Sequence, residues 1–501
     1  MVAQRQLDSS GPKMGEEKLI IRPEKARFVD ILSMLCLRRP ITSYACVEAG
    51  DQTAADIGST PGDWFVALTQ LIQKALAALY YPALGIGAVV EFLLNFIALN
   101  NGILGIVWNL FRCKLVIPLS REAPNFRSFI GMLDGRTELM PLPEGGGPDD
   151  RRLQVVGVTA GKPTVEDYYV DGKSGECGSP TVPLIHQQYV NGQLIRVGTF
   201  SFNWVGLYSC WNTFVEDYTT QAFVMTDRAT DASVVVVAFR DTETFNTRDW
   251  STDVNLSWLG MGEMGHVHVG FLKALGLQED DGADAARAFP KAAPANAVAG
   301  DKPLAYYALR EAVRTQLAAH PNAKVVVTGH SLGGAMASIF PALLAFHGER
   351  DILDRLLAVV TYGQPRVGDQ TFADFVRAGV PVEPLRVVYR YDVVPRFVHG
   401  GTCVYFDGWY DGRAIAAGGD APNPNYFDPR YLLSMYGNAL GDLFKGAFLW
   451  TKEGKDYREG AVSLLYRATG LLVPGVASHS PRDYVNAVRL GSVAVEAKEV
   501  I

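Results

Sequence analysis

The stretch Lys324-Val-Val-Val-Thr-Gly-His-Ser-Leu-Gly-Gly-Ala-Met-Ala-Ser338 joins an apolar, β-branched run to a run of small residues. The first part predicts a buried strand, and the residues from Gly334 onward predict a helix. Between them, Ser331 has a glycine two places to either side, as a serine on a tight strand-to-helix turn requires. This order predicts a nucleophilic serine raised at a sheet edge, and the alternative is a plain glycine turn.

Three more apolar runs rich in β-branched residues surround this stretch, at 234–239, 357–362 and 385–391. Helical patterns separate the runs, over 305–319, 334–345 and 370–377. Alternation of this kind predicts a mostly parallel sheet with covering helices. We therefore expect an α/β fold of the α/β-hydrolase type over residues 151–501. Residues 278–303, rich in Ala, Asp and Pro, are expected to form an exposed, loosely ordered insertion.

A serine hydroxyl becomes an effective nucleophile when an imidazole accepts its proton and a carboxylate orients that imidazole. In this fold the chain order is serine, acid, histidine. Past the turn and the helix that leaves it, only His399 and His479 remain of the eight histidines. His479 is the predicted base, because His399 lies only seven residues after Asp392. Asp392 directly follows a predicted strand and is the predicted acid, with Asp369 as the alternative.

Ester hydrolysis also requires two hydrogen-bond donors for the negative oxygen of the tetrahedral intermediate. The backbone N–H of Leu332 is the first predicted donor. Thr242, which follows the run 234–239, is the second, through its N–H and its hydroxyl. The turn itself comprises Gly329, His330 and Gly333. This chemistry is complete without a metal or a cofactor, so we predict neither.

Between Lys74 and Arg112 the only charged residue is Glu91. A membrane-spanning helix needs about 20 apolar residues, and 92–111 has that length but contains four asparagines. The preceding run is interrupted by Pro82, Gly85 and Gly87. We predict that 64–118 is a broken or hairpin-like pair of helices lying on a lipid surface or membrane. The alternative is a buried helical pair packed on the catalytic domain.

Composition sets the remaining boundaries and excludes other classes of protein. Residues 1–63 are a polar segment without the apolar stretch of a secretory signal, and 119–150 connect to the catalytic domain through a glycine- and proline-rich linker. The six cysteines are scattered and predict reduced thiols. The net charge of −7 and the lack of a basic stripe argue against nucleic acid as a partner. A protein facing the cytosol fits these features.

Five motifs resemble those of the fungal and plant class 3 lipases: FRDT at 239–242, GHSLGG at 329–334, TYGQPRVGD at 361–369, DVVP at 392–395 and the late His479. Three others resemble the plant oil-body triacylglycerol lipases related to castor acid lipase: LIIRPEK at 19–25, DWSTDVNLSW at 249–258 and VHVGFLKALGL at 267–277. The likeness extends over most of the chain. It implies the α/β-hydrolase fold, the same serine, acid and base, and an oxyanion hole from Thr242 and Leu332.

The resemblance also implies a lid after the oxyanion threonine, within 243–258, with Phe245, Trp250 and Trp258 as lid candidates. Large apolar residues among charged ones suit a flap that is wet on one face, and the alternative is ordinary core aromatics. One residue departs from the family pattern: Asp241 stands where the family has glycine. Its carboxylate would weaken an adjacent oxyanion hole unless it turned towards solvent or Arg240.

These features predict a serine lipase that hydrolyses neutral-lipid esters, foremost triacylglycerol, at a lipid-droplet (oil-body) or membrane surface. One alternative is a phospholipase A1 or galactolipase, since the same catalytic groups serve both. Another is a lipid-surface protein on a catalytically weakened lipase scaffold. The acyl-chain preference, the pH optimum and the oligomeric state do not follow from the sequence.

Overall fold

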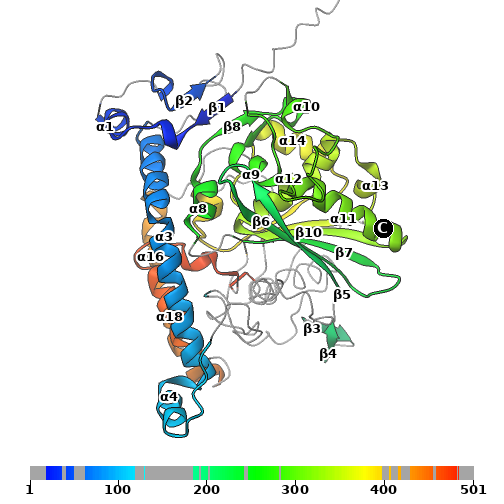
Figure 1. Ribbon diagram of the computed structural model, residues 1–501. Helices are drawn as coiled ribbons and strands as arrows, with labels where there is room; N and C mark the ends of the chain where they lie inside the picture. Colours follow the sequence, from blue (N-terminus) through cyan, green and yellow to red (C-terminus); the bar gives the residue numbers. More distant parts are fainter. Residues whose placement is uncertain are drawn as a thin grey trace, which may run out of the picture.

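The computed structural model describes residues 18–36, 41–49, 63–118, 129, 184–190, 193–200, 203–241, 246–280, 284–397, 405–407, 416–418, 429–454, 458–481 and 483–484. Within these ranges an eight-stranded sheet forms the largest unit, and a column of helices stands along one side of it (Figure 1). A four-stranded sheet and the hairpin of β3 (Leu184–Val190) and β4 (Gln193–Phe200) complete the paired strands of these ranges.

The large sheet has the strand order β14-β13-β12-β11-β10-β7-β6-β5. Its members are β5 (Asn203–Asn212), β6 (Asp217–Thr226), β7 (Val234–Phe239), β10 (Lys324–His330), β11 (Leu356–Tyr362), β12 (Leu385–Val388), β13 (Tyr405–Asp407) and β14 (Ala416–Gly418). The five strands from β13 to β7 run parallel, whereas β14, β6 and β5 are antiparallel to their neighbours. The predicted mostly parallel α/β sheet is confirmed, and the antiparallel strands at its edges are an addition to it.

The central strands of this sheet are apolar on both faces. Helices cover one of these faces. Val235, Val237 and Val325 are buried beneath α9 (Val269–Leu275), α11 (Ala305–Ala319) and α12 (Ser331–Phe346). Phe239 and Phe340 pack with ring centroids 5.8 Å apart. Three shorter helices follow: α13 (Arg350–Leu353), α14 (Gln370–Gly379) and α15 (Val394–Phe397). The α11 helix spans the predicted range 305–319, because apolar residues that recur with helical spacing over this length are a strong helix signal.

The segment expected to be an exposed, loosely ordered insertion is mostly exposed over 291–303, but it is anchored in the core by Ala285, Ala288, Phe289 and Ala297. A short helix, α10 (Ala285–Ala288), begins it, capped by the Asp284 side chain. Phe289 is fully buried, and its ring lies 5.3 Å from that of Tyr306 and 5.8 Å from that of Tyr307. A buried aromatic thus anchors a segment whose composition is otherwise that of a loop.

The N-terminal residues join the catalytic region through a small antiparallel sheet of order β2-β1-β8-β9. Its strands are β1 (Lys18–Ile21), β2 (Val47–Ala49), β8 (Trp258–Gly260) and β9 (His266–His268), with α1 (Phe28–Cys36) between the first two. Leu19 pairs with Trp258 across β1 and β8. Single turns of 3-10 helix, η2 to η5 and η7, lie at Pro23–Lys25, Ile41–Ser43, Gly262–Met264, Pro429–Tyr431 and Ala477–His479.

The apolar region folds as a helical hairpin, α3 (Asp63–Leu99) and α4 (Gly102–Phe111). Pro82 does not break it, contrary to expectation: α3 runs through this residue, and the chain turns at Asn100 and Asn101. The Asn100 side chain locks the turn, because it donates to the Val116 carbonyl at 2.7 Å and accepts from the Val116 N–H at 3.1 Å. Asn95 also donates to the Glu91 carbonyl and Asn109 to the Asn100 side chain, so these three asparagines are no obstacle to an apolar environment.

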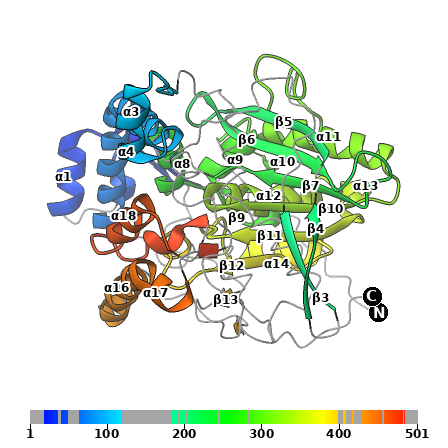
Figure 2. The ribbon, with the colours of Figure 1, turned by 90° about the horizontal axis from the view of Figure 1, so that it is seen from below.

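Among the described residues α3 is the one helix long and apolar enough to cross a membrane: an 18-residue window within Val66–Leu99 has a mean hydropathy of 1.9, and 17% of that window is buried. Beside it stand α16 (Leu432–Phe448), α17 (Trp450–Glu453) and α18 (Ala461–Thr469). Figure 1 shows α3, α16 and α18 in one column, and Figure 2 shows them next to one another along the same edge of the molecule.

Candidate active site

Ser331 sits where β10 ends and α12 begins, at a backbone φ of 53°. This left-handed conformation strains a residue with a side chain. The neighbouring glycines allow it: a Cβ on Gly329 would lie 2.2 Å from the Gly333 carbonyl oxygen, and one on Gly333 would lie 2.3 Å from that of Phe239. The sequence pattern around the serine therefore follows from how closely strand, turn and helix approach one another.

Three predicted residues meet at this turn although they lie far apart in the chain. His479 lies in η7, and its Nδ1 donates to Asp392 Oδ1 at 2.9 Å and Oδ2 at 2.8 Å. A carboxylate only accepts hydrogen bonds, so Nδ1 carries the proton and Nε2 of the neutral ring is an acceptor. The Ser331 hydroxyl lies 2.7 Å from this Nε2 and donates to it. The geometry is that of a hydroxyl ready to lose its proton.

Asp392 is fully buried and is held by two further donors. The Val394 N–H donates to its Oδ1 at 2.9 Å, and the Tyr484 hydroxyl donates to its Oδ2. Burial, together with the neighbouring carboxylate, raises the pKa of Tyr484 well above its ordinary value, so this hydroxyl stays protonated and donates. Sequence reasoning missed Tyr484, because no motif surrounds it and its role appears only once the chain has folded.

The remaining predicted site residues lie away from this hydrogen-bonded group of three, lie beside it in the backbone, or fall outside the described ranges. Asp369, the rival acid, caps α14 through the Phe372 N–H and accepts from His266 Nδ1 at 2.8 Å. The backbone N–H of Leu332 lies in the first turn of α12, where helix amides have no partner within the helix. Thr242, Phe245 and His399 lie outside the residues that the structure describes.

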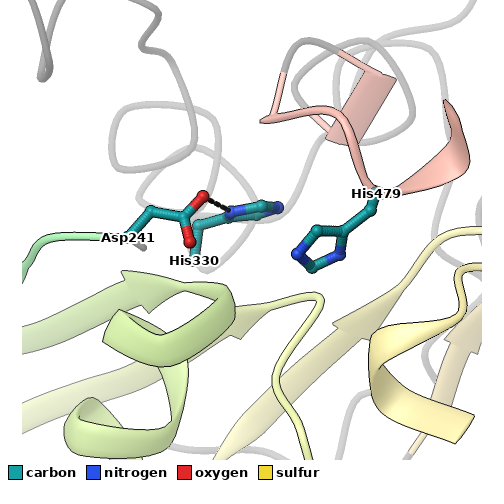
Figure 3. Close-up of side chains that lie close together, drawn as sticks. All are labelled: Asp241, His330 and His479. Carbon is teal, nitrogen blue, oxygen red and sulfur yellow. Dashed lines mark hydrogen bonds and ion pairs between the residues drawn. The ribbon is translucent and has the colours of Figure 1, made fainter. Parts of the chain in front are cut away.

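Asp241 turns neither to solvent nor to Arg240 but to the histidine of the turn. The His330 Nδ1 donates to Asp241 Oδ2 at 2.7 Å, and the His330 ring lies 4.6 Å from that of His479 (Figure 3). Ligand atoms of these three residues lie within 4.8 Å of one another, close enough for a divalent metal ion. Both nitrogens of His479 are engaged, however, so a metal there would displace Ser331 or Asp392.

Of the two lid candidates that the structure describes, one lies in the core and the other at the surface. Trp258 is buried in β8 and packs edge-on against His268, so it belongs to the core and not to a lid. Trp250 is partly exposed on α8 (Thr247–Val254). This helix contacts α3: the Thr247 hydroxyl donates to the Leu76 carbonyl at 2.8 Å, and the Arg248 guanidinium lies 4.1 Å from the centre of the Tyr80 ring.

Gly363 follows β11 at a φ of +56°, and a Cβ there would lie 2.9 Å from both Asp392 Oδ2 and His479 Cε1. We expect Gly363→Ala to push these side chains apart and to lower kcat/KM on a soluble butyrate ester by about 10²-fold, since misplacing a reacting group by about 1 Å costs this much. Gly348→Ala is the matched control, because its φ is +65° and no atom lies within 4 Å of the added Cβ. Equal activity of the two variants would contradict this expectation.

Comparison with known proteins identifies the class to which this site belongs. The family model "Lipase (class 3)" matches residues 236–400. The chain is 32% identical to Triacylglycerol lipase OBL1 of Arabidopsis thaliana, over 96% of this chain and 96% of that protein. It is 34% identical to Triacylglycerol lipase OBL1 of Nicotiana tabacum, over 85% of this chain and 83% of that protein. The chain belongs to the class 3 lipase family.

Among solved structures, the propeptide complex of the Rhizomucor miehei lipase matches 54% of this chain and 72% of its own, at 22% identity and a TM-score of 0.34. The sequence-based predictions of an α/β-hydrolase fold, of a class 3 lipase and of an ester-hydrolysing enzyme are confirmed. A lipase takes a lipid ester as its substrate.

Proposed function

We propose that Ser331, His479 and Asp392 hydrolyse lipid esters through an acyl-enzyme. As Ser331 Oγ attacks the ester carbonyl, His479 Nε2 accepts the hydroxyl proton and then passes it to the departing alcohol oxygen. Water next attacks the acyl-enzyme, His479 accepts a water proton, and the proton returns to Ser331 as the fatty acid leaves. The single observation that carries this proposal is the 2.7 Å contact between Ser331 Oγ and His479 Nε2.

The negative oxygen of the tetrahedral intermediate needs donors that are already in place. The Leu332 N–H is one, because it is a first-turn amide of the helix that begins at the nucleophile. We assign Thr242 as the second. The Asp241 carboxylate accepts a hydrogen bond from His330, which fixes its orientation beside the turn.

The substrate that we propose is triacylglycerol at the surface of a lipid droplet or a membrane, with the enzyme on the cytosolic side. The relatives that match nearly the whole chain are named triacylglycerol lipases. The hairpin of α3 and α4 supports a lipid surface as the site of action, because α4 has no buried residue among those of Gly102–Phe111. Its Leu104 and Phe111 are 86% and 81% exposed, which water disfavours and an acyl layer does not.

We propose α8 as the moving element of the lid, with Trp250 as the side chain that meets lipid. The contact of Thr247 with the backbone of α3 gives this helix a mechanical connection to the apolar hairpin. Binding of the hairpin to lipid would therefore change the environment of the lid at the moment when substrate becomes available.

The test is fatty-acid release by the full chain from emulsions of triolein, phosphatidylcholine and galactolipid. We expect triolein to be hydrolysed at least about 10-fold faster than either polar lipid, a difference of about 1.4 kcal/mol in transition-state stabilisation. Preference for phosphatidylcholine or galactolipid would instead indicate a phospholipase A1 or a galactolipase. Equal release by the wild type and by Ser331→Ala would indicate a lipid-surface protein on an inactive scaffold.

A further inference from the structure

The C-terminal helices α16 and α18 have an inverted distribution of polarity for a protein in water. Most of their outward side chains are large and apolar, and one side of α16 carries them at intervals of three or four residues: Leu433, Tyr436, Leu440, Phe444 and Phe448. Leu433 is 87% exposed, and Leu465 on α18 is 70% exposed. Residues three or four apart share one face of a helix, so α16 presents a continuous apolar stripe to its surroundings.

Of the three charged residues in these helices, Asp442 and Arg467 point inwards and are paired, whereas Lys445 of α16 is exposed. Asp442 of α16 is buried and accepts from Arg390 Nη1 at 2.6 Å. Arg467 of α18 is buried between Glu459, at 2.7 Å, and Asp483, at 3.1 Å. From Gly460 to Ser478 this arginine is the only charged residue. Buried charge pairs beneath a mostly apolar outer face are the arrangement of helices whose surroundings are lipid, and a single exposed lysine can extend its amine to the lipid boundary.

The stripe does not stand alone, because α18 lies beside the α3–α4 helices and α16 follows α18 along the same side of the molecule (Figures 1 and 2). The apolar surface of α3 and α4 and that of the C-terminal helices therefore occupy one side of the protein. Lys452 follows the end of α16, and Arg458 lies over the Trp450 ring at 5.6 Å. A charged turn of this kind stays at the water boundary, so the helices would lie along a lipid surface and not cross it.

The chain that leaves α18 continues directly into the candidate active site. Leu471, Leu472 and Val473 are exposed and lie between α18 and His479. Asp483, the partner of Arg467, is the neighbour of Tyr484, whose hydroxyl donates to Asp392. The segment that carries the base and the segment that holds the acid are thus both attached to α18.

We propose that the outer faces of α16 and α18, together with Leu471–Val473, lie in the acyl-chain layer of a lipid monolayer or leaflet. They form a second lipid-contacting surface beside the α3–α4 hairpin, and they hold the His479 segment at the lipid boundary. This inference deepens the proposed function and depends on its claim of a lipid surface. It assigns a role in that contact to a part of the chain for which composition alone predicts none.

The experiment compares two double variants of the full chain. Leu440→Gln with Phe444→Gln removes the centre of the stripe, and glutamine keeps helix propensity. Val298→Gln with Leu357→Gln changes two apolar residues outside these helices that are 39% and 45% exposed, against 45% and 55% for Leu440 and Phe444. Each chain is floated with triolein droplets coated with phosphatidylcholine, and each is assayed on a soluble butyrate ester. We expect the α16 variant to bind droplets about 10- to 100-fold more weakly and the control to bind within about twofold of the wild type.

Droplet affinity within twofold of the wild type for the α16 variant would overturn the inference. So would a wild-type dimer that the α16 variant dissociates, because the stripe would then be a protein interface. If the variant loses soluble-ester activity, a fluorophore on Phe444→Cys, in a chain with its other accessible cysteines replaced, gives the second measurement. Its emission must shift to the blue on droplets, and an unshifted emission contradicts the inference. Flotation requires no catalysis. A chain that hydrolyses no lipid would therefore contradict the proposed function, and the flotation result would still test the lipid contact of α16.

Discussion

Ser331→Ala is expected to lower kcat on triolein and on a soluble butyrate ester by about 10⁴-fold or more. The loss is this large because removal of the nucleophile leaves only the oxyanion donors and substrate binding, which act as a residual catalyst. The measurement is initial-rate hydrolysis of both substrates by purified wild type and variant. A loss on triolein alone would contradict the expectation, since the hydroxyl acts on every ester.

The backbone at Ser331 supplies the control for folding. Alanine keeps the strained φ of 53°, whereas glycine relieves it. We expect Ser331→Gly to be as inactive as Ser331→Ala but more stable by about 1 kcal/mol, measured by denaturant unfolding. Two inactive variants of different stability would show that activity is lost through the hydroxyl and not through unfolding.

Asp392→Asn is expected to lower kcat by roughly 10³- to 10⁴-fold. The amide keeps the shape of the carboxylate, but it no longer stabilises the imidazolium and it favours the wrong tautomer of His479. It also presents a donor to the Tyr484 hydroxyl, which in the native protein donates to Asp392. The measurement is the pH profile of kcat on the soluble ester, in which activity should recover partly at higher pH, where hydroxide can take the serine proton in place of the imidazole.

Asp369→Asn is the matched control for the acid, since Asp369 is also a carboxylate beside a histidine. Its partner is His266, and it caps α14. We expect this variant to lose less than about 1 kcal/mol of stability, because asparagine caps a helix about as well as aspartate, and to keep its catalytic rate within about twofold. An Asp369 variant as impaired as the Asp392 variant would reverse the assignment of the acid.

The parts of the fold that could be predicted are those in which one local signal dominates. The runs 234–239 and 324–328 are almost wholly apolar and β-branched, and both are buried central strands of the large sheet. Chain order excluded most histidines, and the structure places His479 against Ser331. These inferences needed no knowledge of distant contacts.

The parts that could not be predicted depend on contacts between distant residues. Pro82 reads as a helix breaker, yet α3 continues through it. Phe289 reads as part of a loop until Tyr306 and Tyr307 bury it. The pairing of Asp241 with His330 joins residues 89 apart. Trp258 reads as a lid residue because its neighbours are charged, but pairing with Leu19 places it in the core.

The most direct test of the account is labelling of the folded chain with a fluorophosphonate ester, followed by peptide mass spectrometry. The account predicts one adduct, on Ser331, with no labelling of Ser331→Ala. It also predicts labelling of His479→Ala that is slower by about 10²-fold or more, because the base that activates the hydroxyl is gone. A folded chain that carries no adduct on Ser331, or one that labels equally fast without the imidazole of His479, would contradict it.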